Sequence, residues 1–148
     1  MKGNKKIVFV TGVYDLFHYG HVRFLKEAKK LGDFLLVGVH TDEAVNNYKS
    51  RETVMKEEER IEVVEACRYV DQAILIPEQK SLEMDFYTMH GIDIQVQGDD
   101  FDNYSLPKEL GIFKLVPYTE GISTSKIITR LTKRVTQIMK DMIKDFRG

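Results

Sequence analysis

Short, continuous apolar runs alternate with amphipathic stretches along most of this chain, and this alternation constrains the fold most strongly. Five runs have the length and composition of buried strands: Ile7–Val10, Phe34–Val39, Ala73–Ile76, Ile94–Gln97 and Phe113–Val116. Strands that are apolar on both faces and separated by helices favour a parallel sheet covered on both sides. The sequence therefore predicts an α/β fold with a doubly wound, five-stranded parallel sheet and helices on both faces.

In the stretches between the strands, apolar residues recur at steps of three and four, which predicts amphipathic helices. We expect a helix from about His21 to Leu31 with Gly32 as its C-cap, and further helices over 42–48, 56–69 and 82–90, with a polar loop within 46–53. In the helix over 56–69, the inner positions are expected to include Ile61, Val64, Ala66 and Cys67.

The last stretch, from Ser123, predicts a long amphipathic helix. Its apolar residues are Ile128, Leu131, Val135, Ile138, Met142 and Phe146, and from Lys126 to Gly148 it holds seven basic and two acidic residues. We expect this apolar face to pack on the domain or on a second subunit. Binding to a membrane surface is the less favoured alternative, because the helix lacks Trp.

The length of 148 residues fits one domain, which we expect over 1–132, with 133–148 extending the last helix. The net charge of −1 gives no general argument for binding nucleic acid. Cys67 is the only cysteine, so no internal disulfide is possible and a reducing compartment is expected. The apolar run after the basic N-terminus is too short for a signal peptide or a membrane span, so we expect a cytoplasmic protein.

The most informative motif is His18-Tyr-Gly20-His21, which follows the first apolar run and Gly12. A helix that begins after a strand and a glycine turn offers unpaired backbone N–H groups and a partial positive charge to anions. Gly20 leaves room for a phosphate or a nucleotide ring, and two imidazoles can stabilise charge on a phosphoryl group. The motif predicts a phosphate site. A metal site is the alternative, but it lacks a third ligand.

A second anion site is predicted at Thr119-Glu-Gly-Ile-Ser-Thr-Ser125, directly before the last helix. An ordinary N-cap needs one hydroxyl, so three hydroxyls after a glycine favour phosphate binding. Lys49 and Arg51 follow the second strand and could form a basic loop that closes over an anionic substrate. Gly98-Asp99-Asp100 ends the fourth strand and forms either a base or ribose contact or a simple turn. All of these motifs follow strands, where parallel sheets bind ligands.

Together these residues resemble the nucleotidyltransferase superfamily marked by His-x-Gly-His and Ile-Ser-Thr-[Ser/Thr]. Within it, the chain is similar to the small cytidylyltransferases that act on glycerol-3-phosphate, ethanolamine-phosphate and choline-phosphate. The resemblance spans about 6–131 and includes Asp15–His21, Gly38–Glu43, Thr53–Met55, Glu59-Arg60, Cys67–Asp71 and Thr119–Ser125. It implies a Rossmann-like fold, a homodimer, and Mg²⁺ held mainly by the nucleotide phosphates, with no metal site on the protein.

The resemblance also implies roles for individual residues. The catalytic residues would be His18, His21, Lys49, Ser123 and Thr124. The nucleotide would contact Gly12, Val13, Tyr14, Gly20, Arg68, Gly98, Asp99, Tyr118, Thr119, Gly121 and Ile122. The second substrate would contact Asp15 and Lys49, and Lys80 is a further candidate because it follows the third strand.

The implied reaction is an attack by a phosphate oxygen of the substrate on the α-phosphorus of CTP, which releases pyrophosphate without a covalent enzyme intermediate. One residue departs from the family pattern, because Tyr118 stands where an arginine is usual. Either Arg51, Lys126 or another cation supplies the missing charge, or one of two alternatives holds: an ATP-dependent adenylyltransferase acting on a sugar phosphate, or a nucleotide-binding relative without catalysis.

The acceptor alcohol is less constrained by the sequence. The compact length and Ile76-Pro77-Glu78 favour glycerol-3-phosphate, followed by ethanolamine-phosphate or choline-phosphate. A quaternary ammonium group is recognised best by Trp, which the chain lacks, so choline-phosphate is weakly disfavoured. The product would be a precursor of phospholipid or teichoic acid.

Overall fold

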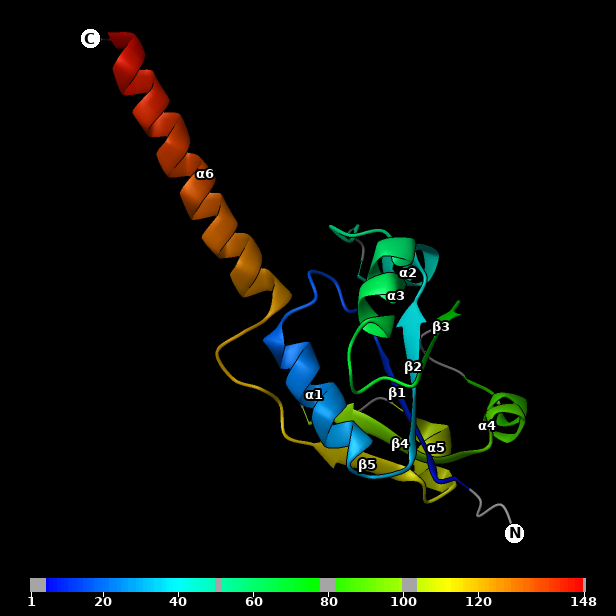
Figure 1. Cartoon of the computed structure of the whole chain (residues 1–148). Helices are drawn as coiled ribbons and strands as arrows, with labels where there is room; N and C mark the ends of the chain where they lie inside the picture. Colours follow the sequence, from blue (N-terminus) through cyan, green and yellow to red (C-terminus); the bar gives the residue numbers. More distant parts are fainter. Residues whose placement is uncertain (1–4, 50–51, 78–81, 100–103, 148) are drawn as a thin grey trace.

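The computed structural model describes residues 5–49, 52–77, 82–99 and 104–147, with the side chains of Tyr48, Lys49, Phe146 and Arg147 outside the described set. A five-stranded parallel sheet forms the centre of the molecule, as predicted (Figure 1). Its strands are β1 (Ile7–Gly12), β2 (Phe34–His40), β3 (Gln72–Ile76), β4 (Ile92–Gly98) and β5 (Phe113–Val116). Their order is β3-β2-β1-β4-β5.

Helices pack on both faces of the sheet, again as predicted. The described helices are α1 (Tyr19–Lys29), α2 (Asp42–Lys49), α3 (Glu57–Glu65), α4 (Met84–His90), α5 (Ser105–Glu109) and α6 (Thr124–Arg147), of which α6 projects away from the sheet. Alternate residues of β1 point to opposite faces: Val8 and Val10 pack with residues of α1 and α3, and Phe9 packs with residues of α4 and α5. Each face of the sheet therefore has its own apolar core.

The direction of winding reverses at β1. The chain runs from β1 outward through β2 to β3 and then returns to place β4 on the other side of β1. In an open parallel sheet, such a reversal opens a crevice at the carboxyl ends of the two strands. The carboxyl ends of β1 and β4 are thus the expected place for a ligand.

Several helix boundaries differ from the sequence prediction. α1 begins at Tyr19 because the His18 side chain accepts a hydrogen bond from the Gly20 N–H, and its C-cap is Lys30 rather than Gly32. α3 ends at Glu65 instead of Tyr69, because the chain then turns so that the Asp71 carboxylate can accept the Leu35 N–H of β2.

Other corrections concern single elements. α2 extends to Lys49, into the stretch predicted as a loop, and α4 begins at Met84 rather than at residue 82. The five-residue helix α5 was not predicted. Ala66 is exposed, so its assignment to the inner face of α3 was wrong, whereas Val64 is fully buried.

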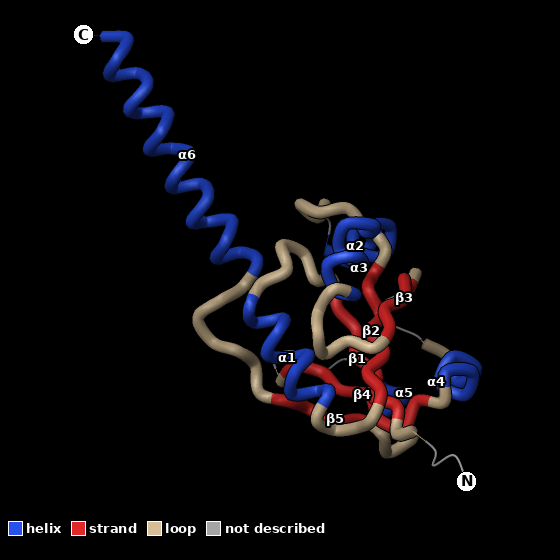
Figure 2. The backbone as a smooth tube through the Cα atoms, viewed as in Figure 1, coloured by secondary structure: helices blue, strands red, loops and turns tan. Residues whose placement is uncertain are grey.

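Helix α6 leaves the α/β domain as a single long rod (Figures 1 and 2). We expected its apolar face to pack on the domain or on a second subunit; the domain does not cover it, because Leu131, Val135 and Ile138 are half exposed, and packing on a second subunit stays a prediction. Across the described residues, none of the helices combines the length and apolar character needed to cross a bilayer.

Candidate active site

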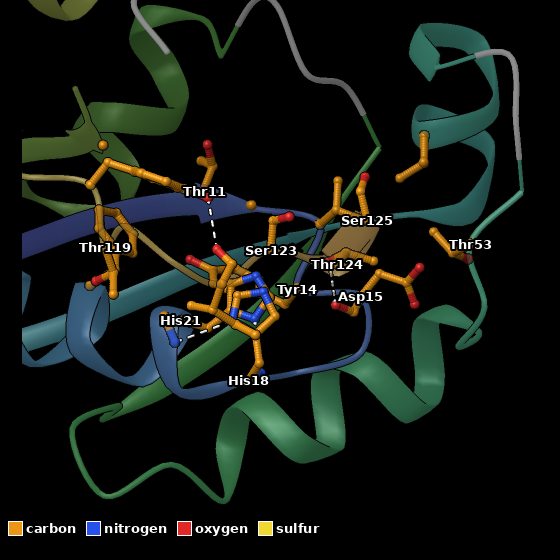
Figure 3. Close-up of a pocket in the computed structure, with 18 of the residues that line it drawn as sticks. Thr11, Tyr14, Asp15, His18, His21, Thr53, Thr119, Ser123, Thr124 and Ser125 are labelled. Carbon is orange, nitrogen blue, oxygen red and sulfur yellow. Dashed lines mark hydrogen bonds between the residues drawn. The ribbon is translucent and has the colours of Figure 1, made fainter. Parts of the chain in front are cut away.

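A cavity of about 400 Å³ lies at the carboxyl ends of β1 and β4, where the winding reverses. Its volume is within the range of small-molecule sites. Most residues predicted from the two phosphate motifs line it (Figure 3). These are Gly12, Val13, Tyr14, Asp15, His18, Gly20, His21, Gly98, Tyr118, Thr119, Ile122, Ser123 and Thr124.

Five predicted site residues are not among those that line this cavity. Arg68 lies in the turn after α3 with an exposed side chain, and Gly121 lies beside the Tyr19 hydroxyl. The Asp99 carboxylate accepts the Tyr118 N–H at 2.7 Å and so supports the cavity wall. Lys80 and the side chain of Lys49 lie outside the described residues.

The histidine pair is held by the backbone at the start of α1. The Nδ1 atom of His18 accepts the Gly20 N–H, and the Nδ1 atom of His21 accepts the His18 N–H, each at 3.2 Å. A backbone N–H can only donate, so neither Nδ1 carries a proton in this arrangement. Each neutral ring therefore carries its proton on Nε2 and offers an N–H donor there.

The two rings stack, with their centroids 3.8 Å apart and an angle of 19° between their planes. Burial lowers the pKa of His18 from its ordinary value of 6.5. A lowered pKa favours the neutral ring, in agreement with the backbone hydrogen bond to Nδ1. The pair is thus organised to donate hydrogen bonds as neutral imidazoles.

Gly20 is required by the close packing between the two motifs. A Cβ atom at this position would lie 2.9 Å from the Ile122 side chain and 3.0 Å from the His18 ring. Any side chain here would push the start of α1 away from the loop that precedes α6. The glycine therefore allows the two anion motifs to form one cavity.

The loop between β1 and α1 is anchored by Asp15. Its carboxylate accepts the N–H groups of Leu16 at 3.1 Å and of Val54 and Met55 at 2.9 Å. Tyr14 and Leu16 have positive φ angles of 57° and 47°, so this loop holds a left-handed backbone conformation that residues other than glycine rarely adopt. Asp15 lines the cavity, but its carboxylate is already engaged by these amides.

The second motif forms the start of α6 and contacts the first. The Ser123 hydroxyl accepts the Lys126 N–H at 3.2 Å, which caps the helix. The Thr124 hydroxyl donates to the Asp15 carbonyl at 2.9 Å, as Figure 3 shows. The first turn of α6, with its exposed backbone N–H groups, therefore faces the same cavity as the histidines.

Tyr118, which replaces the arginine of the family pattern, shapes the wall of the cavity. Its hydroxyl donates to the Ile122 carbonyl at 2.9 Å and so closes the turn that carries the second motif. Its side chain is 44% exposed, which leaves ring surface available to a ligand. Tyr118 thus supplies structure and an aromatic surface, but not the positive charge that an arginine would bring.

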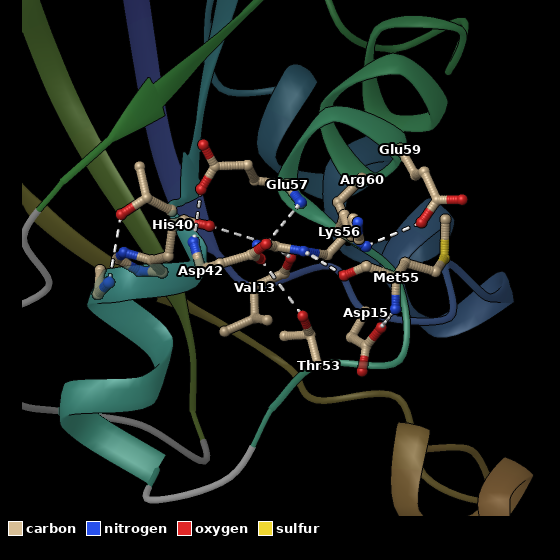
Figure 4. A network of polar contacts seen from close by, with 12 residues as sticks. Val13, Asp15, His40, Asp42, Thr53, Met55, Lys56, Glu57, Glu59 and Arg60 are labelled. Carbon is tan, nitrogen blue, oxygen red and sulfur yellow. Dashed lines mark hydrogen bonds and ion pairs between the residues drawn. The ribbon is translucent and has the colours of Figure 1, made fainter.

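Arg60 belongs to one of the motifs that carry the family resemblance, Glu59-Arg60, but it was not predicted as a site residue. Its side chain is 0% exposed, and it donates to the carbonyls of Val13, His40 and Met55 (Figure 4). Its remaining hydrogen bond goes to the Asp42 carboxylate at 2.6 Å. Arg60 therefore holds the loop after β1 to the end of β2.

The network has a clear effect on Asp42. Burial raises the pKa of this carboxyl, but the hydrogen bonds from Arg60, from the Glu57 N–H and from Thr53, together with the Arg60 charge, lower it by more. Asp42 is accordingly an ionised partner of Arg60.

Several residues that line the cavity were not assigned a site role from the sequence. They are Thr11, Phe24, Val45, Glu52, Thr53, Val54, Gln97, Pro117, Ser125 and Ile128. Ser125 does belong to the predicted second anion motif, and Gln97 also gives a signal in the sequence, because it is polar and ends an apolar strand. The described lining contains no Lys or Arg, so histidines, hydroxyls and backbone N–H groups are its anion donors.

Comparisons with known proteins agree with this architecture. A family model described as cytidylyltransferase-like matches residues 9–130. The ethanolamine-phosphate cytidylyltransferase of Dictyostelium discoideum is 41% identical over 140 residues, which cover 88% of this chain and 39% of that protein. Choline-phosphate cytidylyltransferase A of Homo sapiens is 43% identical over 135 residues, which cover 85% of this chain and 36% of that protein.

A solved structure is similar as well. The lipopolysaccharide core biosynthesis protein from Thermoplasma volcanium GSS1 superposes with a TM-score of 0.65 at 33% identity, covering 80% of this chain and 100% of that one. The chain spans about two fifths of the length of the curated relatives that it matches. The matched residues contain the whole sheet except the first two residues of β1, and they contain both anion motifs, so the chain belongs to the cytidylyltransferase-like family.

Proposed function

We propose that the chain transfers a cytidylyl group from CTP to a small phosphorylated alcohol, giving a CDP-alcohol and pyrophosphate. The observation that carries the proposal is that both anion motifs, from opposite ends of the sequence, line one cavity of about 400 Å³. The histidine pair and the first turn of α6 form two separate sets of donors there. A nucleoside triphosphate and a phosphorylated acceptor need two such sets of donors, one for the phosphates of each substrate.

The reaction would proceed by positioning and charge stabilisation. A phosphate oxygen of the acceptor attacks the α-phosphorus of CTP in line with the departing pyrophosphate. The Nε2–H groups of His18 and His21 donate to the oxygens on which charge increases in the transition state. The backbone N–H groups at the starts of α1 and α6 hold the other phosphates. No step requires an enzyme nucleophile.

Mg²⁺ would be held by the phosphates of the nucleotide. Within the described residues, no group of three or more His, Cys, Asp or Glu side chains is placed to hold a metal ion. The Asp15 carboxylate, which lines the cavity, is occupied by backbone amides. When bound, the ion would neutralise phosphate charge that the described lining, which has no Lys or Arg, does not neutralise.

We place ethanolamine-phosphate first among the acceptors, then choline-phosphate. The relatives reported above carry the names of these two substrates, whereas glycerol-3-phosphate was placed first from the sequence. The two carboxylates in the cavity lining, Asp15 and Glu52, provide negative charge that suits an amino-alcohol better than glycerol. The absence of Trp favours a primary over a quaternary ammonium.

A panel assay tests this function. Pyrophosphate release would be measured with CTP or ATP against ethanolamine-phosphate, choline-phosphate, glycerol-3-phosphate and a heptose phosphate. We expect the highest kcat/KM with CTP and ethanolamine-phosphate. Preference for ATP with the sugar phosphate would replace the proposal with an adenylyltransferase.

A nucleotide-binding protein without catalysis is the second candidate. The observation that favours it is Tyr118, which brings no positive charge to the cavity. Calorimetry that detects CTP binding, combined with no turnover for any acceptor in the panel, would support this candidate over the enzyme.

A further inference from the structure

Two polar side chains, those of Thr11 and Gln97, lie on the face of the sheet that α1 does not cover. In the register of β1 and β4, Phe9 pairs with Gln95, and Thr11 and Gln97 follow two residues further along the same face. Phe9 packs with residues of α4, and the Gln95 side chain accepts the hydroxyl of Tyr87 in α4. Both Thr11 and Gln97 line the cavity. The cavity therefore has a second polar wall, on the side of the sheet opposite to α1.

The Gln97 side chain has an acceptor without a donor. Its Oε1 atom is buried, and no group in the described part of the chain donates a hydrogen bond to it. The neighbouring Thr11 hydroxyl differs, because it is already bonded to the Tyr104 hydroxyl at 2.7 Å. Buried polar atoms in native proteins are nearly always paired, so an unpaired acceptor in a cavity wall indicates a partner on the ligand. The ligand group that reaches Gln97 must then carry an N–H or O–H.

The phosphates of the substrates cannot satisfy this atom. Phosphate oxygens accept hydrogen bonds, as Oε1 of Gln97 does, so the two would repel each other. The donors for phosphate are the histidine pair and the first turns of α1 and α6. In-line attack brings the acceptor to the α-phosphorus from the side opposite to the departing pyrophosphate. The wall with Thr11 and Gln97 is therefore suited to the end of the acceptor that carries no phosphate.

We propose that Gln97 selects acceptors with a primary ammonium, by accepting an N–H of ethanolamine-phosphate at its Oε1 atom. This role rests on the cytidylyl transfer proposed above and assigns the residue that discriminates between acceptor alcohols. A primary ammonium carries several N–H donors, whereas the trimethylammonium of choline carries none and would leave Gln97 unpaired. A site built to hydrogen-bond a substrate rejects the analogue that lacks the donor. The carboxylate of Glu52, which also lines the cavity, favours the same cation.

Acceptors that differ only in N-methylation test this role. Ethanolamine-phosphate, its monomethyl and dimethyl derivatives and choline-phosphate lose their N–H donors one at a time. With CTP and the wild-type chain, kcat/KM should fall along the series, with the largest step, about tenfold or more, where the last N–H is lost. Gln97→Met keeps the length of the side chain but has no amide oxygen, so it should remove that step.

Two measurements separate this role from a structural one. The oxygen has no partner in the ligand-free chain, so Gln97→Met should not lower the melting temperature. The Kd of CTP, measured by calorimetry, should also stay unchanged. Gln72→Met makes the same change at an exposed position of β3, and it should leave the acceptor series as it is in the wild type.

Several outcomes would overturn the assignment of Gln97. If Gln97→Met keeps the wild-type series, or weakens CTP binding instead, its oxygen does not bind the ammonium. A wild-type chain that prefers choline-phosphate or glycerol-3-phosphate would overturn the assignment too, and would leave cytidylyl transfer standing. If the wild type turns over no acceptor at all, the proposed function itself fails, and the role of Gln97 fails with it.

Discussion

The Nδ1 atoms of His18 and His21 both accept backbone hydrogen bonds, and this determines which nitrogen of each ring carries the proton. The packing around the third residue of the motif explains why Gly20 cannot be exchanged freely. Gly20 supplies the N–H that His18 accepts, and it also leaves the space that Ile122 fills. One short motif thus caps a helix, fixes two tautomers and admits the second motif.

His18→Asn separates the capping role of this residue from its chemical role. The asparagine oxygen can accept the Gly20 N–H as Nδ1 does, because Asn is a good N-cap, but the Nε2–H donor is lost. We expect kcat to fall about 10²–10³-fold. The midpoint of urea unfolding should stay near that of the wild type. A variant with normal kcat would remove His18 from the mechanism.

The pH dependence of the reaction follows from the lowered pKa of His18. In the proposed mechanism the neutral ring is the active form, so activity should persist as pH falls to the ordinary pKa of 6.5 and decline only below it. Unfolded chains bind the proton at higher pH than the folded chain, so stability also decreases as pH falls below that value. The log of kcat/KM plotted against pH should therefore show an acid limb centred below 6.5. A limb centred above it would require a protonated catalytic histidine.

At the scale of elements, Arg60 links three segments that are distant in sequence. It is fully buried in α3 and donates to the Val13 carbonyl just after β1 and to the His40 carbonyl at the end of β2. Arg60→Met would remove the guanidinium donor from these carbonyls and the charged partner from Asp42, and we expect a loss of about 3–5 kcal/mol in the free energy of unfolding. Urea denaturation measures the change, and the exposed Arg68→Met should shift it by less than about 0.5 kcal/mol. Equal stability of the two variants would show that the network has no structural role.

The start of α6 depends on one side-chain contact to the loop before α1. Thr124→Val removes the hydroxyl that donates to the Asp15 carbonyl, and we expect a loss of about 1 kcal/mol in unfolding free energy with a raised KM for CTP. Thr124→Ser keeps the hydroxyl and serves as the control. If Val and Ser behave alike in both measurements, this contact does not position the second motif.

The strands were predictable because each is an apolar run buried on both faces. Helix ends were less predictable, because contacts between residues distant in sequence decide them. For example, the chain turns after α3 so that the Asp71 carboxylate accepts the Leu35 N–H of β2. The short α5 contains Pro107 and only five residues, too few for a periodic pattern. Arg60 could not be placed either, because sequence alone does not reveal which carbonyls will surround a side chain.

For the whole molecule, the parallel topology explains how far the site could be predicted. The motifs after β1, β4 and β5 follow strand ends, and parallel strands bring those ends to one edge of the sheet. That reasoning correctly brings His18 and Ser123 to one cavity. It could not show that Asp99 and Arg68 lie outside the lining, because these positions depend on the paths of turns. Nor could it show that α6 would leave the domain.

The most direct test follows the phosphorus atoms of the reaction. Phosphorus NMR of the full chain with CTP, Mg²⁺ and ethanolamine-phosphate should show CDP-ethanolamine and pyrophosphate forming at equal rates. The His18→Asn variant should slow both signals equally. Two results would contradict cytidylyl transfer by this site, provided that no other acceptor reacts. One is that CTP stays unchanged, and the other is that CMP or CDP is released without any CDP-ethanolamine.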